Sequence, residues 1–116
     1  MNIEQTRNQI TAATIKAVGT RAAEEYFYNV LGGEDRGTCG FAWVWVMPQH
    51  NGRTKAGKAE RQTLAELGFE KSYSGAFKLY ASYPVQSIDV QEREARAMAQ
   101  FLQEQGYTAH TQSRMD

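Results

Sequence analysis

The sequence predicts an α+β domain in which a long N-terminal helix precedes a four-stranded antiparallel sheet. Three observations predict this class. The first thirty residues carry apolar side chains at helical spacing, residues 39–47 form a strongly strand-like segment, and two later helical segments each end in glycine followed by an aromatic residue. A chain of 116 residues has the size of one domain. We therefore expect residues 1–116 to form a single domain, with the N-terminal helix at 1–31 and the sheet-forming core at 39–112.

The composition narrows the classes of protein that the chain can belong to. Hydrophobic residues make up 41% and charged residues 22%, which is typical of a folded domain. Thirteen basic and thirteen acidic residues balance, which excludes a globally basic nucleic-acid coat or a strongly acidic mimic of DNA. One cysteine excludes an internal disulfide, and no apolar run approaches the roughly 20 residues that span a bilayer. We expect a soluble cytoplasmic protein that does not enter a membrane.

The first two elements are predicted from their periodicity. The opening helix has an apolar stripe and ends at the glycine pair that follows residue 31. The residues of that stripe are Ile3, Ile10, Thr14, Ala17, Val18, Ala22, Tyr26 and Val30. The strand at 39–47 alternates, so that Phe41, Trp43 and Trp45 share one face, while smaller apolar residues occupy the other. Two apolar faces indicate a central strand covered on both sides.

The remaining elements complete a βαββαβ order. We expect a helix at 55–67, strands at 69–73 and 76–82 joined by a tight turn, a helix at 89–105, and a last strand at 107–112 followed by a tail. Asp89 and Glu92 have the spacing of a capping box at the start of the second of these helices. The order is that of the ferredoxin-like fold, with the first and third strands central. Right-handed crossovers place both helices on one face, and the N-terminal helix is the obvious cover for the other.

The segment between Gly52 and Ala59 resembles a phosphate-binding loop. It matches most of the pattern G-x-x-x-x-G-K-[ST] and lies between a strand and a helix. Ala59 stands where a magnesium-binding hydroxyl is required, so nucleotide hydrolysis is disfavoured. Binding of a phosphate or another anion at the start of the helix remains open.

Trp43 and Trp45 allow two interpretations. Aromatic side chains on the central strands of this topology stack on bases in RNA-recognition modules, and Tyr80 on the third strand could join them. Alternatively, the indoles belong to the core beneath the N-terminal helix, and the sequence favours this interpretation because large exposed aromatic patches are unusual on a monomer.

No complete catalytic or metal-binding set is recognisable. Cys39, His50 and His110 show no ligand spacing, and they match no signature of a nucleophilic cysteine. We therefore predict no catalytic residue, no metal and no cofactor.

Several short segments resemble a group of small bacteriophage proteins of unknown role. They are the strand Cys39-Gly40-Phe41-Ala42-Trp43-Val44, the Ser74-Gly75 turn, the alanine-rich helix 95–102 and the ending Ser113-Arg114-Met115-Asp116. The likeness covers roughly the last two thirds of the chain. It implies a phage origin and the cytoplasm of an infected bacterium, and it implies no activity.

We predict a non-enzymatic binding module, a phage accessory protein that acts on a host protein. A homodimer through the N-terminal helix is left open. The alternative function is binding of single-stranded nucleic acid, a nucleotide or phosphate by the tryptophan strand and the basic loop at 50–61. The candidate residues for that alternative are Trp43, Trp45, His50, Arg53, Lys55, Lys58, Arg61, Tyr80 and Arg114.

Overall fold

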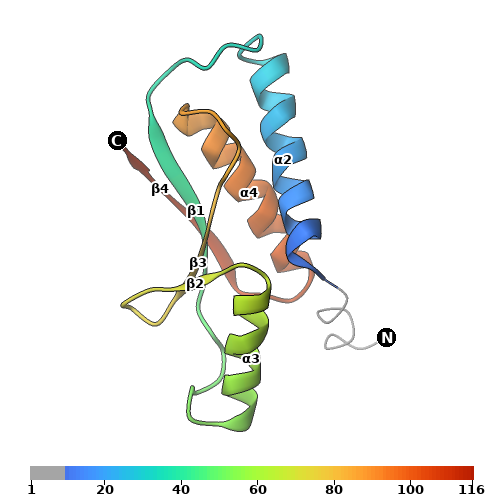
Figure 1. Ribbon diagram of the computed structural model, residues 1–116, viewed down its shortest axis with the longest axis vertical. Coiled ribbons are helices and arrows are strands. Elements are labelled where there is room, and N and C mark those ends of the chain that lie inside the picture. Colours follow the sequence, from blue (N-terminus) through green and yellow to red (C-terminus); the bar gives the residue numbers. More distant parts are fainter. Residues whose placement is uncertain (1–9) are drawn as a thin grey trace.

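The computed structural model describes residues 10–116, shown in Figure 1. In chain order the elements are α2 (Ala12–Asn29), β1 (Gly40–Val46), α3 (Lys55–Glu66), β2 (Glu70–Lys71), β3 (Phe77–Tyr80), α4 (Ile88–Glu104) and β4 (Ala109–Met115). The predicted α+β class is confirmed, with an N-terminal helix ahead of a four-stranded antiparallel sheet.

The four strands form one sheet in the order β2-β3-β1-β4, and each neighbouring pair is antiparallel. β1 pairs with β4 along its whole length, from Gly40 opposite Met115 to Val46 opposite Ala109. On its other side β1 pairs with the four residues of β3. The central positions of the first and third strands are those predicted.

One face of the sheet is covered by α4, and α2 packs against α4 rather than against the sheet. Figure 1 shows α4 between α2 and the strands. Alternate residues of β1 are buried beneath α4, from Gly40 through Ala42 and Val44 to Val46. The apolar side of α4 meets them; its buried apolar residues are Val90, Ala95, Met98, Ala99 and Leu102.

The contact between α2 and α4 is close because Gly19 has no side chain. A Cβ atom at this position would lie 2.8 Å from Met98 Cγ and 2.9 Å from Glu94 Cγ. The buried residues of α2 are therefore Ile15, Gly19 and Ala23, at intervals of four.

The predicted stripe of the first helix is largely wrong. Thr14, Ala17 and Val30 are exposed, whereas Val18, Ala22 and Tyr26 are half-buried at the margins of the contact. Ile10 is buried in the core, and Ile3 lies outside the described residues. The helix begins at Ala12, because Thr11 caps it by accepting a hydrogen bond from the Thr14 amide. Apolar periodicity missed the buried face because α2 approaches α4 most closely at Gly19, and a glycine carries no apolar side chain that the pattern could detect.

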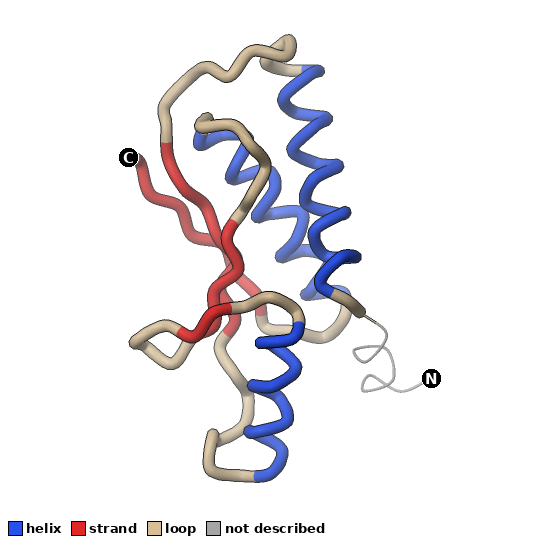
Figure 2. Tube along the Cα trace, in the orientation of Figure 1, coloured by secondary structure: helices blue, strands red, loops and turns tan. Residues whose placement is uncertain are grey.

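α3 lies beyond one end of the sheet, as Figure 2 shows. The prediction that this helix covers a face of the sheet is therefore wrong. Only its C-terminal part reaches the core, through Leu64 and Leu67, and Phe69 follows them. Most of the other side chains of α3 are polar or charged, so the helix has too little apolar surface to lie flat on a sheet.

Several predicted boundaries move for identifiable reasons. The last strand continues to Met115, so residues 113–115 are strand and not tail, because β1 extends far enough to pair with them. β2 and β3 are shorter than predicted, since Ser72 already turns and donates its amide to Ala76 O. α4 begins at Ile88, one residue before Asp89, and the Asp35 carboxylate accepts the Gln86 and Ser87 amides there, which replaces the predicted capping box.

Candidate functional site

The open face of β1 carries three aromatic side chains in alternate positions. Phe41 is 48% exposed, and Trp43 and Trp45 are partly exposed. Their alternation with the buried residues of β1 puts all three on the side of the sheet opposite α4. The face assignment made from the sequence is therefore confirmed.

The strands on either side of β1 extend this aromatic row sideways. Residues opposite each other in an antiparallel pair point to the same face, so the register identifies the neighbours of each ring. From β3 these are Lys78 and Tyr80, and from β4 they are His110, Gln112 and Arg114. We call the set Phe41, Trp43, Trp45, Lys78, Tyr80, His110, Gln112 and Arg114 the open face.

Trp43 occupies the centre of the open face and contacts both neighbouring strands. Its ring centroid lies 5.6 Å from that of Tyr80, and the Lys78 amine lies 4.9 Å from the ring centroid. Its indole N–H donates to Gln112 Oε1 at 3.1 Å. These contacts fix the ring orientation while leaving part of the ring surface in solvent.

Trp45 pairs with His110, whose ring centroid is 5.7 Å away. Arg114 stands opposite Phe41 at the other end of β1. The open face therefore places positively charged or ionisable groups beside each aromatic ring of β1.

No helix covers this face within residues 10–116. The favoured interpretation of the tryptophans, as core beneath the N-terminal helix, is wrong. That helix finds its partner in α4, on the other side of the sheet (Figure 1). The physical reason is size, because the face that packs carries glycine, alanine and valine and lets α4 approach closely.

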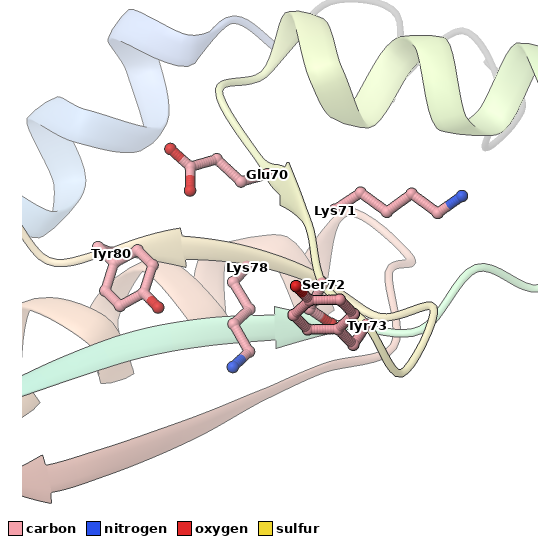
Figure 3. Close-up of a pocket in the computed structure, with 6 residues that line it drawn as sticks. All are labelled: Glu70, Lys71, Ser72, Tyr73, Lys78 and Tyr80. Carbon is pink, nitrogen blue, oxygen red and sulfur yellow. The ribbon is translucent and has the colours of Figure 1, made fainter.

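A hollow of about 460 Å³ adjoins the open face at the β2–β3 turn (Figure 3). Lys78 and Tyr80 line it from β3, and Tyr73 at the turn is fully exposed. Figure 3 shows the Glu70 carboxylate pointing away from the Lys78 amine. The hollow connects the open face to the exposed ring of Tyr73.

A second hollow, of about 330 Å³, lies at the other end of β1 and is lined by residues that include Phe41, Cys39 and Tyr83. The Cys39 thiol is exposed and donates to Gln86 Oε1 at 3.4 Å. Burial, together with the neighbouring Tyr28 and Glu24, raises the pKa of the Tyr83 phenol above its usual 10.0.

The basic loop forms a different structure from a phosphate-binding loop. The Glu60 carboxylate accepts the Gln49 and His50 amides at 2.8 and 3.0 Å. The Thr54 hydroxyl accepts the Gly57 amide at 3.0 Å, so the helix start already has its cap. Arg61 donates to two carbonyl oxygens, those of His50 and Gly57. These groups serve to fold the loop, and the Thr54 hydroxyl already holds one of the helix-start amides that a phosphate would need.

The candidate residues therefore separate into two groups. Trp43, Trp45, Tyr80 and Arg114 come together on the open face. The others belong to the loop and the first turns of α3, which form one tip of the molecule in Figure 2; they are His50, Arg53, Lys55, Lys58 and Arg61. Nothing in the register connects this tip to the centre of β1.

Sequence reasoning missed four residues of the open face as candidates, namely Phe41, Lys78, His110 and Gln112. The alternation around Tyr80 already placed Lys78 on its side of the strand. His110 and Gln112 could have been found only with the register of β4 against β1, which pairs them with Trp45 and Trp43.

Within residues 10–116, no group of three or more histidine, cysteine or acidic side chains is placed to hold a metal ion. Cys39, His50 and His110 lie in three different places: the start of β1, the basic loop and β4. In the same part of the chain, no helix is long and apolar enough to cross a bilayer.

No protein-family model, no curated protein and no solved structure matches this chain.

Proposed function

We propose that this protein binds single-stranded nucleic acid on the open face of its sheet. One observation carries the proposal. The aromatic rings of β1 and β3 share an uncovered face with Lys78, His110 and Arg114. Aromatic rings for bases and cations for phosphates are the two components of a platform for single strands.

The ring spacing favours a single strand over a duplex. Residues two apart on a strand are separated by about 6.6 Å, so neighbouring rings of Phe41, Trp43 and Trp45 stand about that far apart. Bases within a duplex stack at about 3.4 Å. Bases can therefore lie on successive rings only if they are separated from one another, as they are in an unpaired strand.

The charges of the open face suit a phosphate chain that follows β1, because both neighbouring strands carry a cation. Arg114 is exposed on β4 and the Lys78 amine stands over Trp43, so phosphates on either side of a stacked base have a cation within reach.

We further propose that β1, α3, β2, β3, α4 and β4 constitute a ferredoxin-like βαββαβ unit. The strand order β2-β3-β1-β4 supports this, and the position of α3 beyond the sheet end departs from the usual arrangement. RNA-recognition modules use the same face of such a sheet. The segment 74–80 does not match their basic-aromatic octamer, so the proposal rests on the open face and not on that motif.

The direct test is a titration of the protein with fluorescent single-stranded and duplex oligonucleotides of matched sequence. We expect the single strands to bind more tightly. Replacing Trp43 or Trp45 with Ala should weaken binding roughly 5- to 150-fold, the equivalent of about 1–3 kcal/mol per stacked base. Tyr28→Ala is the matched control, because Tyr28 is 62% exposed but lies on α2.

A second pair of variants separates the open face from the basic loop. Arg114→Gln should lower the slope of log K against log salt by about 0.7, the value for one phosphate contact to a single strand. Lys58→Gln, on α3, should leave the slope unchanged. The opposite result would move the binding site to the loop, and equal binding by wild type and Trp43→Ala would refute the proposal.

Binding of a host protein by a phage accessory factor stays a second proposal, supported by the absence of a complete catalytic set. Capture from infected cells with and without nuclease separates the two. A partner retained after nuclease treatment, lost in Trp43→Ala and kept in Tyr28→Ala, would make the open face a protein-binding surface.

A further inference from the structure

β4 is an edge strand whose outer side is open. The Asp116 amide donates to Cys39 O, the residue opposite it. Main-chain groups of an antiparallel pair point alternately toward and away from the partner strand, so this bond shows which residues of β4 point toward β1. Even-numbered residues of β4 therefore direct their main-chain groups toward β1, and Thr111, Ser113 and Met115 direct theirs outward. Ala109 O, the first outward carbonyl, is occupied by the Gln103 amide at 2.7 Å. Within residues 10–116, no strand pairs with the remaining outward groups.

This edge has few of the features that usually block pairing, and Arg114 is its one lysine or arginine. It is seven residues long and contains neither proline nor lysine, and its register with β1 runs without a bulge. Such an edge can accept another strand from Thr111 onward, beyond the carbonyl that Gln103 occupies.

We propose that β4 pairs antiparallel with β4 of a second copy about a twofold axis at Gln112, joining two sheets into one of eight strands. In this register Gln112 meets its own copy, and Thr111 meets Ser113. The outward main-chain groups then bond in pairs, and the open faces of both copies lie on the same side of the joined sheet. The inference does not depend on what the open face binds.

The helix layer fits this arrangement. α4 lies above β1 and β4, so its axis and that of the second copy are separated by about two strand spacings, close to 10 Å. That is the usual distance between packed helices. The side of α4 toward the edge is accessible, because a groove of about 260 Å³ runs between Glu92 and Arg96 of α4 and residues 111–113 of β4.

Charge complementarity identifies a second copy as the occupant. Glu92 lies beside Ser113, whose hydroxyl donates to it at 2.9 Å, and Arg96 lines the same groove beside Thr111. The twofold axis sets Thr111 of one copy beside Ser113 of the other, and Ser113 beside Thr111. Glu92 therefore faces Arg96 of the partner subunit, and the reciprocal pair forms on the other side of the axis. Within residues 10–116, Arg96 has no ion pair of its own.

Sedimentation equilibrium on the full chain tests the association. We expect a concentration-dependent dimer. Arg96→Glu should weaken it ~10-fold or more, because like charges then face each other twice. Glu92→Arg should act similarly, and the double variant should restore the dimer. Arg93→Glu is the matched control, since Arg93 stacks over Tyr26 of α2 and faces away from β4.

A cross-linking experiment tests the register. In a Cys39→Ser background, Gln112→Cys should form an intermolecular disulfide on mild oxidation. Gln112 and its copy would stand directly opposite each other without exchanging main-chain hydrogen bonds. The Cα atoms of such a pair lie about 4.5 Å apart, which is within the range that a disulfide spans. Arg114→Cys should not cross-link, because its two copies lie four residues apart along the strands, about 13 Å.

Three results would overturn the proposal. One is a wild-type chain that stays monomeric at about 1 mM, where a dimer with a Kd of 1 mM would hold half of the chains. The second is equal cross-linking at positions 112 and 114. The third is a dimer that survives both single charge reversals. Melting curves of each variant, recorded by circular dichroism, establish that loss of the dimer is not loss of the fold.

Discussion

Glu94 offers the sharpest test of how this fold is held together. It is a carboxylate with only 1% of its surface exposed, on the side of α4 that meets α2. Its two oxygens accept the Ser82 amide at 3.1 and 2.9 Å, and one of them also accepts the Tyr83 amide at 2.8 Å. The side chain therefore attaches the connection between β3 and α4 to the helix layer.

Glu94→Gln removes one acceptor and places an amide donor against the two backbone donors. A hydrogen bond to a charged group contributes about 1.5–3 kcal/mol, so the loss of one sets the expected destabilisation. Water reaches Ser82, which is exposed, and this holds the cost toward the lower value. For a domain of this size the melting temperature should fall by roughly 5–10 °C. Glu94→Ala should cost more, because it also leaves a cavity.

Urea unfolding followed by tryptophan fluorescence measures the change, and Glu104→Gln at the exposed end of the same helix is the control. The control should lie within about 0.5 kcal/mol of wild type. If Glu94→Gln were equally neutral, the carboxylate would not anchor the connection. Faster amide exchange at Ser82 and Tyr83 in the variant would show that the lost stability arises at these bonds.

Three further substitutions test the close approaches and the cap of the fold. Gly57→Ala should destabilise the protein by well over 1 kcal/mol in thermal melts, because a Cβ atom cannot coexist with the Asn51 carbonyl beside it. Gly19→Val should cost about 1–3 kcal/mol by separating α2 from α4, and adding Met98→Ala should recover part of the loss in urea unfolding; no recovery would contradict the packing. Asp35→Ala should cost about 0.5–2 kcal/mol and speed hydrogen exchange at the start of α4, and unchanged exchange there would show that the cap is not needed.

The sequence predicted the elements that carry strong local signals. The alternation of β1, the helix ends at Gly68 and Gly106 and the central place of the first and third strands all follow from period, turn residues and chain order. These signals are local, and the fold did not alter them.

The prediction failed where long-range packing decided the outcome. Nothing local distinguishes the stripe through Ala17 and Val18 from the one through Ile15 and Gly19, since only the facing helix selects glycine. The length of β4 depended on the start of β1, about seventy residues earlier. The basic loop resembled a phosphate site because the pattern does not reveal that the Thr54 hydroxyl caps the helix start and holds the Gly57 amide.

The choice between the two faces of β1 is a question of side-chain size. Both faces are apolar, so hydrophobicity alone cannot decide which one packs. On the buried face, a Cβ atom on Gly40 would already lie 2.7 Å from Ile88 Cδ1 of α4, and indoles could not occupy a layer that tight. The large rings therefore stand on the open side, where burial worth about 1.5–3 kcal/mol for a fully covered ring is only partly realised in the monomer. That unrealised burial is available to whatever covers the face, so a ligand that stacks on Trp43 and Trp45 should raise the melting temperature as well as bind.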